Sequence, residues 1–320
     1  MNLYTKNIGK SFSGVNVLRN VNFSLEPGEV HALVGENGAG KSTFVKVLSG
    51  VYTPTIGNIY LDNQKVLINT PIAAQKNGIS LIHQEPQSFS HLSVAENIFM
   101  GHMDGSNFSR VKWKDINKSS EKILSSIGLE IDPKNIMEGL SIADQQMIEI
   151  AGALSKNSKI LIMDEPTSPL TPNEVGKLFN IVKQLKDQGM AIIFISHRLE
   201  EIRAIADRVT IFRDGDLITT KKINEVSNEE IIKYMIGRSI EDIEVKENDY
   251  LKSNETILSV NNISQVGNFK NISFDLKKGE ILGFAGLVGA GRTEVAKTIF
   301  GAENYDEGEI AFKGNLILNK

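Results

Sequence analysis

Short apolar runs that end in polar residues recur along the first 240 residues. The runs at 30–34, 160–163 and 191–195 have the length of strands, and polar residues follow each of them directly. Apolar runs of this length are typical of parallel strands that are buried on both faces of a sheet. Such sheets hold ligands at the carboxyl ends of their strands, so the polar residues there are candidates for a binding site.

Helical patterns lie between these runs. Thr171 and Glu174 form a capping-box pattern with Pro172 at the first helical position, and they predict a helix that stops near Gly189. Residues 93–157 look mostly helical and predict a separate lobe. The first part of the chain is therefore predicted to be α/β, with a parallel-sheet core and a helical insertion.

Part of the chain is repeated. Aligned on itself at an offset of 251 residues, the sequence matches 20–59 to 271–310 without a gap, and 13 of these 40 positions are identical. The stretch at 241–255 is acidic and polar with little apolar periodicity, which is typical of a linker. We predict a first domain at 1–240, a linker at 241–255 and the N-terminal part of a second copy at 256–320. We expect this second copy to be incomplete, as in a truncated protein or the product of an interrupted gene.

A glycine-rich loop follows the run at 30–34 and precedes a predicted helix. It has the phosphate-binding pattern Gly35-x4-Gly40-Lys41-Ser42. The glycines let backbone N–H groups surround phosphates, and the helix adds the partial positive charge of its N-terminus. Lys41 is expected to contact the transferred phosphate of a nucleoside triphosphate, and Ser42 to ligate Mg²⁺. The candidate nucleotide-binding residues of the loop are Gly35, Glu36, Asn37, Gly38, Ala39, Gly40, Lys41, Ser42 and Thr43.

Polar residues after other apolar runs complete the candidate site. Asp164 is placed to hold Mg²⁺, and Glu165 can polarise the attacking water as a general base. Gln84 can reach the metal or the attacking water, while His197 can bond to the γ-phosphate or position Glu165. Taken alone, the two acids could be solvated loop residues and His197 a structural histidine. The phosphate-binding loop favours the catalytic interpretation.

The order of these motifs, with residues 140–146 (LSIADQQ) between Gln84 and Asp164, resembles an ABC-type ATPase. The resemblance covers the first domain and the start of the second. It implies a P-loop NTPase fold with an antiparallel β subdomain and a helical lobe around the parallel-sheet core, and ATP and Mg²⁺ as cofactors. Residues 140–150 and 163–171 are similar to one branch, the ATP-binding subunits of bacterial sugar importers of the ribose, galactoside and xylose type, which carry two fused ATPase modules.

The resemblance implies roles for two further residues. Phe12 matches the aromatic residue that stacks on adenine, although it could instead be a core aromatic of a strand. Ser141 belongs to the signature that contacts ATP held by the opposite module. Its common form, Leu-Ser-Gly-Gly-Gln, is altered at 142–144. We expect Ala143 to hinder close backbone approach and Asp144 to place negative charge near the phosphates, which would weaken the site that this signature serves.

The second copy of the phosphate-binding loop departs further from the pattern. Arg292 stands in place of lysine and Glu294 in place of threonine. Arginine lacks the compact point charge of lysine, and the glutamate would compete with phosphate. In this family the phosphate-binding loop of each module meets the signature of the other module, so the Lys41 loop is expected to meet the signature of the second module. These 320 residues would then contain one well-formed loop and no well-formed signature to close over it.

The resemblance implies an ATP-hydrolysing subunit that energises a membrane permease importing a sugar or a related small solute. Its expected partners are integral-membrane permease subunits, contacted through the Gln84 region and the helical lobe, and through them a solute-binding protein. A second ABC module, in cis or in another copy of the chain, is also expected. Two alternatives stay open: a soluble tandem ABC ATPase of translation or DNA repair, and a fragment that binds ATP without hydrolysing it.

Composition narrows these choices. The net charge of −4 argues against nucleic acid as a partner, and the lack of cysteine excludes thiol catalysis and disulfides. The N-terminus is too polar for a secretory leader, and the apolar runs are far shorter than the roughly 20 residues of a membrane-spanning helix. We therefore expect a cytoplasmic protein that is held at the inner face of the cell membrane through the permease.

Overall fold

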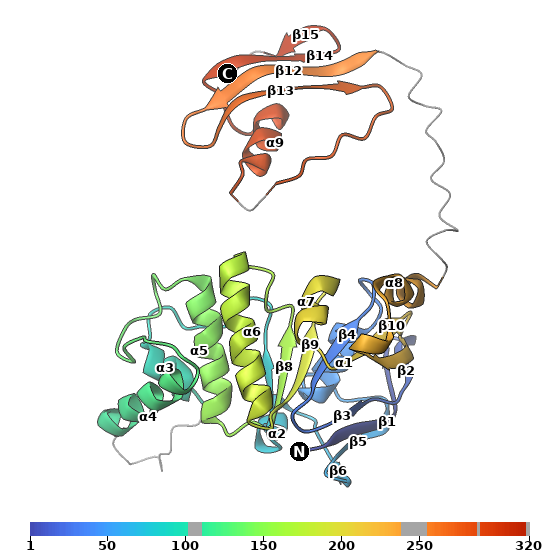
Figure 1. Cartoon of the computed structure of the whole chain (residues 1–320), viewed down its shortest axis with the longest axis vertical. Coiled ribbons are helices and arrows are strands. Elements are labelled where there is room, and N and C mark those ends of the chain that lie inside the picture. The colour runs from blue at the N-terminus through green and yellow to red at the C-terminus, as the bar shows by residue number, and fades with distance from the viewer. Residues whose placement is uncertain (102–110, 238–254, 287–288, 318–320) are drawn as a thin grey trace. The chain divides into compact units, whose positions relative to one another are not determined.

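The chain consists of two units. The structure, a computed structural model, describes residues 1–101, 111–237, 255–286 and 289–317. Its contacts divide the chain into unit 1, Met1–Asp242, and unit 2, Ile243–Lys320 (Figure 1). Most of the predicted linker, 241–254, lies outside the described residues. In the part of the chain that is described, none of the helices combines the length and apolar character needed to cross a bilayer.

A six-stranded sheet forms the centre of unit 1. Its order is β11-β10-β4-β9-β8-β7; neighbours from β10 to β7 run parallel, and the edge strand β11 runs antiparallel to β10. The three apolar runs of the sequence become β4, β8 and β9, three adjacent strands. The strands are β4 (Val30–Val34), β7 (Ile79–Ile82), β8 (Ile160–Asp164), β9 (Ala191–Ile195), β10 (Arg208–Arg213) and β11 (Asp216–Lys222).

Side chains of this sheet pack on both of its faces, as uninterrupted apolar strands require. On β8, Leu161 and Met163 join a core shared with α5 (Ile142–Ser155) and α6 (Pro172–Asp187), whereas Ile160 and Ile162 join a core shared with α1 (Lys41–Leu48). The helices of unit 1 outside its helical lobe are α1 (Lys41–Leu48), α2 (Pro71–Lys76), α6 (Pro172–Asp187), α7 (Leu199–Ile205), the 3-10 helix η1 (Ile223–Glu225) and α8 (Asn228–Ile236).

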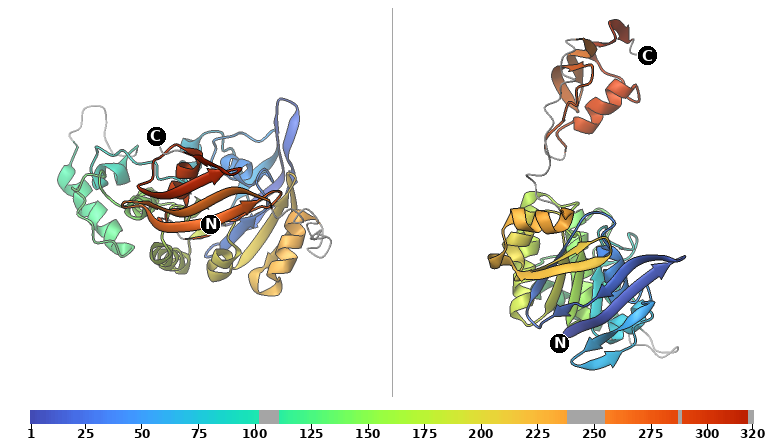
Figure 2. Two further views of the ribbon diagram at one scale, coloured as in Figure 1. Left: turned by 90° about the horizontal axis from the view of Figure 1, so that it is seen from above. Right: turned by 90° about the vertical axis from the view of Figure 1, so that its right-hand side faces the viewer.

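An antiparallel sheet, ordered β2-β1-β5-β6 with β3 paired to β1, lies beside the parallel sheet (Figure 2). Its apolar residues Leu3, Ile8 and Leu18 belong to the core that contains α1. This sheet is the predicted antiparallel subdomain. Its strands are β1 (Leu3–Phe12), β2 (Val15–Val21), β3 (Ser24–Leu25), β5 (Ile56–Leu61) and β6 (Gln64–Val66).

The predicted helical lobe contains α3 (Val94–Phe99), α4 (Trp113–Ser126) and α5 (Ile142–Ser155). The predicted capping box of α6 is present, with the backbone N–H of Thr171 donating to Glu174 Oε2 at 2.8 Å. The Thr171 hydroxyl also donates to this oxygen, at 2.7 Å. The predicted P-loop fold, with its parallel core, antiparallel subdomain and helical lobe, is confirmed.

Unit 2 reproduces the antiparallel sheet of unit 1 at the offset of the sequence repeat. Its sheet order β13-β12-β14-β15 corresponds to β2-β1-β5-β6, and α9 begins at Arg292, the counterpart of Lys41. The described residues 281–285, which correspond to β4, form no strand, and Ile281 is 95% exposed. The elements are β12 (Thr256–Gln265), β13 (Phe269–Lys277), α9 (Arg292–Phe300), β14 (Glu307–Phe312) and β15 (Asn315–Ile317).

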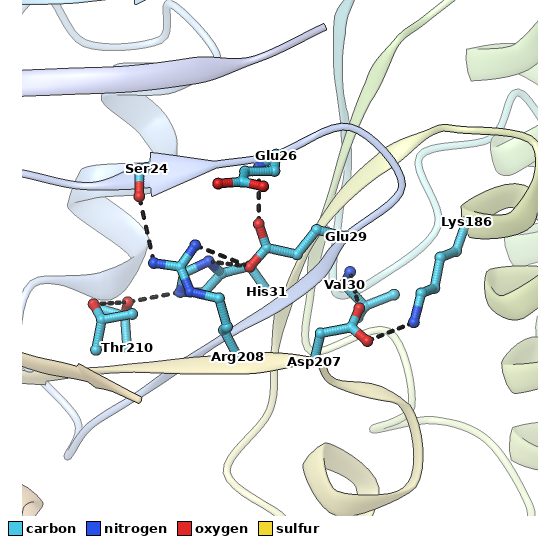
Figure 3. Close-up of polar contacts among 10 residues, drawn as sticks. Ser24, Glu26, Glu29, Val30, His31, Lys186, Asp207, Arg208 and Thr210 are labelled. Carbon is cyan, nitrogen blue, oxygen red and sulfur yellow. Dashed lines mark hydrogen bonds and ion pairs between the residues drawn. The ribbon is translucent and has the colours of Figure 1, made fainter. Parts of the chain in front are cut away.

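A buried polar cluster ties the amino end of β4 to β10 (Figure 3). His31 is fully buried, with Nε2 2.7 Å from Thr210 Oγ1 and Nδ1 3.0 Å from Glu29 Oε1. Arg208 Nη1 lies 3.3 Å from the same Glu29 oxygen. Burial lowers the pKa of His31 below its ordinary 6.5, although Glu29 opposes this. The cluster therefore holds an imidazole for which protonation is unfavourable.

Candidate active site

The phosphate-binding loop leaves β4 at its carboxyl end and leads into α1. Gly35 and Gly40 have φ values of 154° and 104°, which side chains disfavour. A Cβ atom at Gly35 would lie 2.3 Å from the carbonyl oxygen of Phe212, so only glycine fits there. The backbone N–H of Gly215 also donates to the carbonyl of Ala39 at 3.1 Å. The loop is thus held against β10 and the turn that follows it.

Lys41 lies inside this loop. Its ammonium group donates to the carbonyl oxygens of Gly35, at 2.7 Å, and Glu36, at 3.0 Å, and the residue is only 7% exposed. Burial lowers the pKa of Lys41, while the charges of Glu165 and Asp164 oppose this. A positive charge is therefore held beside the loop and within electrostatic reach of the acidic pair. Ser42 and Thr43 follow in the first turn of α1.

The acidic pair lies where β8 ends. Burial, followed by the neighbouring charge of Glu165, raises the pKa of Asp164, while Lys46, Lys41 and His83 oppose this. Glu165 has a φ of 48°, a left-handed conformation that is uncommon for residues other than glycine. Its backbone N–H donates to the carbonyl of Ile195 at 3.1 Å. This turn directs the Glu165 side chain out of the strand.

Three of the predicted residues meet at the ends of adjacent strands. Glu165 Oε1 lies 3.4 Å from His197 Nδ1, and Gln84 Nε2 donates to Glu165 Oε2 at 3.4 Å. Gln84 follows β7, Glu165 follows β8 and His197 follows β9, so the order of strands in the sheet creates this cluster. The side chain of His197 is 59% exposed, which argues against a buried structural histidine.

Phe12 lies at the end of β1 and is 38% exposed, so it is not a core aromatic. The edge-on Tyr52 ring is 5.1 Å from the Phe12 ring between centroids, and Lys10 Nζ lies 4.9 Å from the Phe12 centroid. An exposed aromatic ring supported in this way offers a surface for stacking.

Ser141 caps α5 at its N-terminus. Its hydroxyl oxygen accepts from the backbone N–H of Asp144 at 3.1 Å, and the hydroxyl donates to Asp144 Oδ2 at 2.8 Å. The expectation that the Ala143 methyl obstructs this surface is wrong, because Ala143 is 7% exposed and packs in the core of unit 1. Ile142, which is 50% exposed, is the apolar side chain that projects from the signature.

Sequence reasoning missed two charged residues beside the site. Lys46, one turn after Ser42 on α1, carries a positive charge that opposes the rise in the pKa of Asp164. Glu201 on α7 is buried and contacts Thr167, two residues after Glu165, and Ser196, which immediately precedes His197. The available signal for Glu201 was its place on an apolar helix face with Ile202 and Ile205, where a charged residue needs partners.

The fold and the loop after β4 define the class of P-loop nucleotide-binding proteins. A family model described as ABC transporter matches residues 18–168 and 269–320, which together are more than half of the chain. The chain belongs to the ABC transporter family.

Curated relatives carry more specific names. A ribose import ATP-binding protein of Streptomyces avermitilis is 45% identical over 99% of this chain and 62% of its own length. A putative ribose/galactose/methyl galactoside import ATP-binding protein of Agrobacterium fabrum is 46% identical over 98% of this chain and 61% of its own length. The chain therefore spans about three fifths of the length of these relatives.

Solved structures agree on the fold. A nucleotide-free ATP-binding cassette from an ABC transporter matches with a TM-score of 0.64 and 27% identity, over 74% of this chain and 96% of that one. The ADP conformation of another such cassette matches with a TM-score of 0.66 and 27% identity, over 74% of this chain and all of that one. The predicted resemblance to ABC-type ATPases is confirmed.

Proposed function

We propose that this chain is an ATP-binding and ATP-hydrolysing subunit that energises a membrane permease importing a sugar or a related small solute. The observation that carries the proposal is the convergence of Gln84, Glu165 and His197 on the acidic end of β8, within electrostatic reach of Lys41. The names of the curated relatives support the class of solute.

ATP would bind along the phosphate-binding loop. Backbone N–H groups of residues 35–43 and the N-terminus of α1 would surround the phosphates, and Lys41 would move its donors from loop carbonyls to phosphate oxygens. Phe12 would stack on adenine, with Tyr52 supporting its ring from the edge.

The donor set suits Mg²⁺, which prefers hard oxygen ligands. Ser42 offers a hydroxyl, Asp164 a carboxylate and Gln84 an amide oxygen, since the amide nitrogen of Gln84 faces Glu165. When bound, the ion would neutralise charge on the phosphate oxygens. Glu165 would accept the proton of the attacking water, and His197 would position Glu165 or bond to the γ-phosphate.

Complete closure of this site would need a signature from another ATPase module. In this family that module is a second one in the same chain or in another copy, and Ser141 would serve the nucleotide of that module. The hydrogen bond from Ser141 to Asp144 supports weak nucleotide binding by this signature, because the hydroxyl proton already has an acceptor. Turnover would therefore be slow where only this signature is available.

The permease contact would lie between the Gln84 segment and α5. A cavity of about 240 Å³ is lined there by His83, Phe89, Glu149 and Lys156 among others. Gln146 Nε2, on α5, donates to the carbonyl of His83 at 3.2 Å. This bond ties the segment beside the nucleotide to the helical lobe, which supports a route for motion to the permease. The permease would in turn hold the chain at the cytoplasmic face of the membrane and contact a solute-binding protein.

The test is ATP turnover as a function of protein concentration, with nucleotide binding measured alongside. Lys41→Ala and Glu165→Gln are the matched variants. Turnover that rises faster than linearly and is lost in both variants supports hydrolysis by paired copies. Nucleotide binding that depends on Lys41, without turnover at any concentration, would instead support a chain that binds ATP and requires another module for hydrolysis. Binding that ignores Lys41 would overturn the proposal.

A further inference from the structure

Glu201 is a buried carboxylate at the start of α7. The residue is 7% exposed, and its side chain accepts three hydrogen bonds. Thr167 Oγ1 donates to Oε2 at 2.7 Å, Ser196 Oγ donates to the same oxygen at 2.6 Å, and Arg198 Nη1 donates to Oε1 at 3.2 Å. A buried carboxylate requires such partners, because losing water without replacement is costly.

These contacts join the two segments that carry the proposed catalytic residues. Thr167 lies two residues after Glu165, and Ser196 immediately precedes His197. The backbone N–H of Arg198 also donates to Ser196 Oγ at 3.0 Å, which fixes the orientation of that hydroxyl. A single carboxylate oxygen thus accepts from the segment after β8 and from the segment after β9.

The segments after β8 and β9 also contact each other elsewhere. The Glu165 N–H bonds to the carbonyl of Ile195, where the two strands are still paired. Beyond that point, Glu201 joins the two segments through Thr167 and Ser196. The side chains of Glu165 and His197 also meet there, with Oε1 3.4 Å from Nδ1. Removal of the carboxylate would release both segments at once and leave two buried hydroxyls without their acceptor.

We propose that Glu201 is a positioning residue for ATP hydrolysis. Glu201, Thr167 and Ser196 form a clamp that holds Glu165 and His197 at their mutual spacing. The proposal rests on the proposed function. Because Glu201 contacts loop segments and not the phosphate-binding loop, it should govern the rate of the chemical step and leave nucleotide affinity in place.

The first test compares Glu201→Gln and Glu201→Ala with Glu200→Ala, which removes an exposed glutamate from the same helix. The clamp predicts that kcat falls about tenfold or more in Glu201→Ala and less in Glu201→Gln, which keeps one acceptor oxygen. Nucleotide affinity should stay within about twofold, and Glu200→Ala should resemble the wild type. An equal loss of affinity and kcat in Glu201→Gln would overturn the proposal.

A second test keeps Glu201 and removes its partners, which guards against misfolding of the Glu201 variants. Thr167→Val and Ser196→Ala should each lower kcat, and neither should lower it further in a Glu201→Ala background, where no acceptor is left for either hydroxyl. Fully additive effects would show that these residues act independently and would overturn the clamp.

Hydrogen exchange separates the clamp from the proposed function, since it needs no turnover. Glu201→Gln should speed amide exchange in both segments, 165–170 and 196–200, and leave β8 protected. If nucleotide binding by the wild type does not depend on Lys41, the proposed function fails while this result still decides the clamp. Faster exchange in only one segment, or in neither, would overturn it.

Discussion

Ser141 and Asp144 exchange two hydrogen bonds across the first turn of α5. The hydroxyl oxygen of Ser141 accepts from the Asp144 backbone N–H at 3.1 Å, and the hydroxyl itself donates to the Asp144 carboxylate at 2.8 Å. The proton that a phosphate oxygen would need is therefore shared with a carboxylate. The same carboxylate adds negative charge at a helix N-terminus that would otherwise attract an anion.

We expect Asp144→Ala to raise ATP turnover severalfold under conditions where paired copies hydrolyse ATP, because it frees the hydroxyl proton and removes the charge. The change should also cost about 0.5–1 kcal/mol of stability, since an acid in the first turn favours the helix. Steady-state turnover and thermal unfolding measure the two effects. Asp115→Ala, which removes an exposed first-turn acid from α4, is the matched control and should lower stability alone. Lower turnover in Asp144→Ala would contradict this account.

Much of the fold followed from the apolar pattern. The runs at 30–34, 160–163 and 191–195 became β4, β8 and β9, since strands buried on both faces leave a plain signal in sequence. The sequence repeat has a structural counterpart in unit 2: β14 and β15 coincide with β5 and β6 once the offset of 251 is applied.

The site was less accessible to sequence reasoning. Gln84, Glu165 and His197 were predicted as a group because each follows a short apolar run and because of their order with the phosphate-binding loop, but their roles stay a proposal. The Ala143 prediction failed because a residue's place beside a helix cap does not reveal which side chain faces the core. Glu201 escaped notice because its partners Thr167 and Ser196 come from different loops, so only the folded chain brings them together.

Lys41 and Arg292 occupy equivalent positions in the two phosphate-binding loops, which permits a matched comparison. Lys41→Ala should weaken nucleotide binding at least about tenfold, or about 1.4 kcal/mol, because it removes a buried cation from the loop. Arg292→Ala should change affinity by less than about threefold, since Glu294 already opposes an anion there. Isothermal titration calorimetry with each variant decides the matter. A larger effect from Arg292→Ala would show that the second loop is the principal site.

Ionisation of Asp164 lowers the stability of the folded chain. Burial and the adjacent Glu165 raise its pKa, so its contribution to stability is full at low pH and is lost as pH rises through the raised pKa. In buffer without Mg²⁺, Asp164→Asn should therefore raise the Tm at pH 7.5 by roughly 2–4 °C, or about 1 kcal/mol. The difference should shrink below pH 3.8, the ordinary pKa of aspartate, where both side chains are neutral. A lower Tm for the variant at pH 7.5 would show that the Asp164 charge is favourably paired.

His31 gives the opposite dependence on pH. Burial lowers its pKa from 6.5, so the unfolded chain binds a proton more readily, and the stability that this residue contributes is lost as pH falls below about 6.5. Glu29, Arg208 and Asp207 all act on the imidazole. Although burial alone would raise the pKa of Glu29, contacts with His31, the Glu26 amide and Arg208 lower it from 4.5, so its titration lies below this range.

We expect His31→Gln to reduce the pH dependence of the unfolding free energy between pH 6.5 and 5. One proton taken up on unfolding corresponds to a slope of about 1.4 kcal/mol per pH unit, and the variant should lose up to that amount. Urea unfolding at several pH values measures the slope. His91→Gln, which changes a side chain that is 86% exposed, should leave the slope unchanged. If both variants keep the wild-type slope, His31 is already protonated in the folded chain, and the polar cluster at the amino end of β4 holds an imidazolium paired with Glu29.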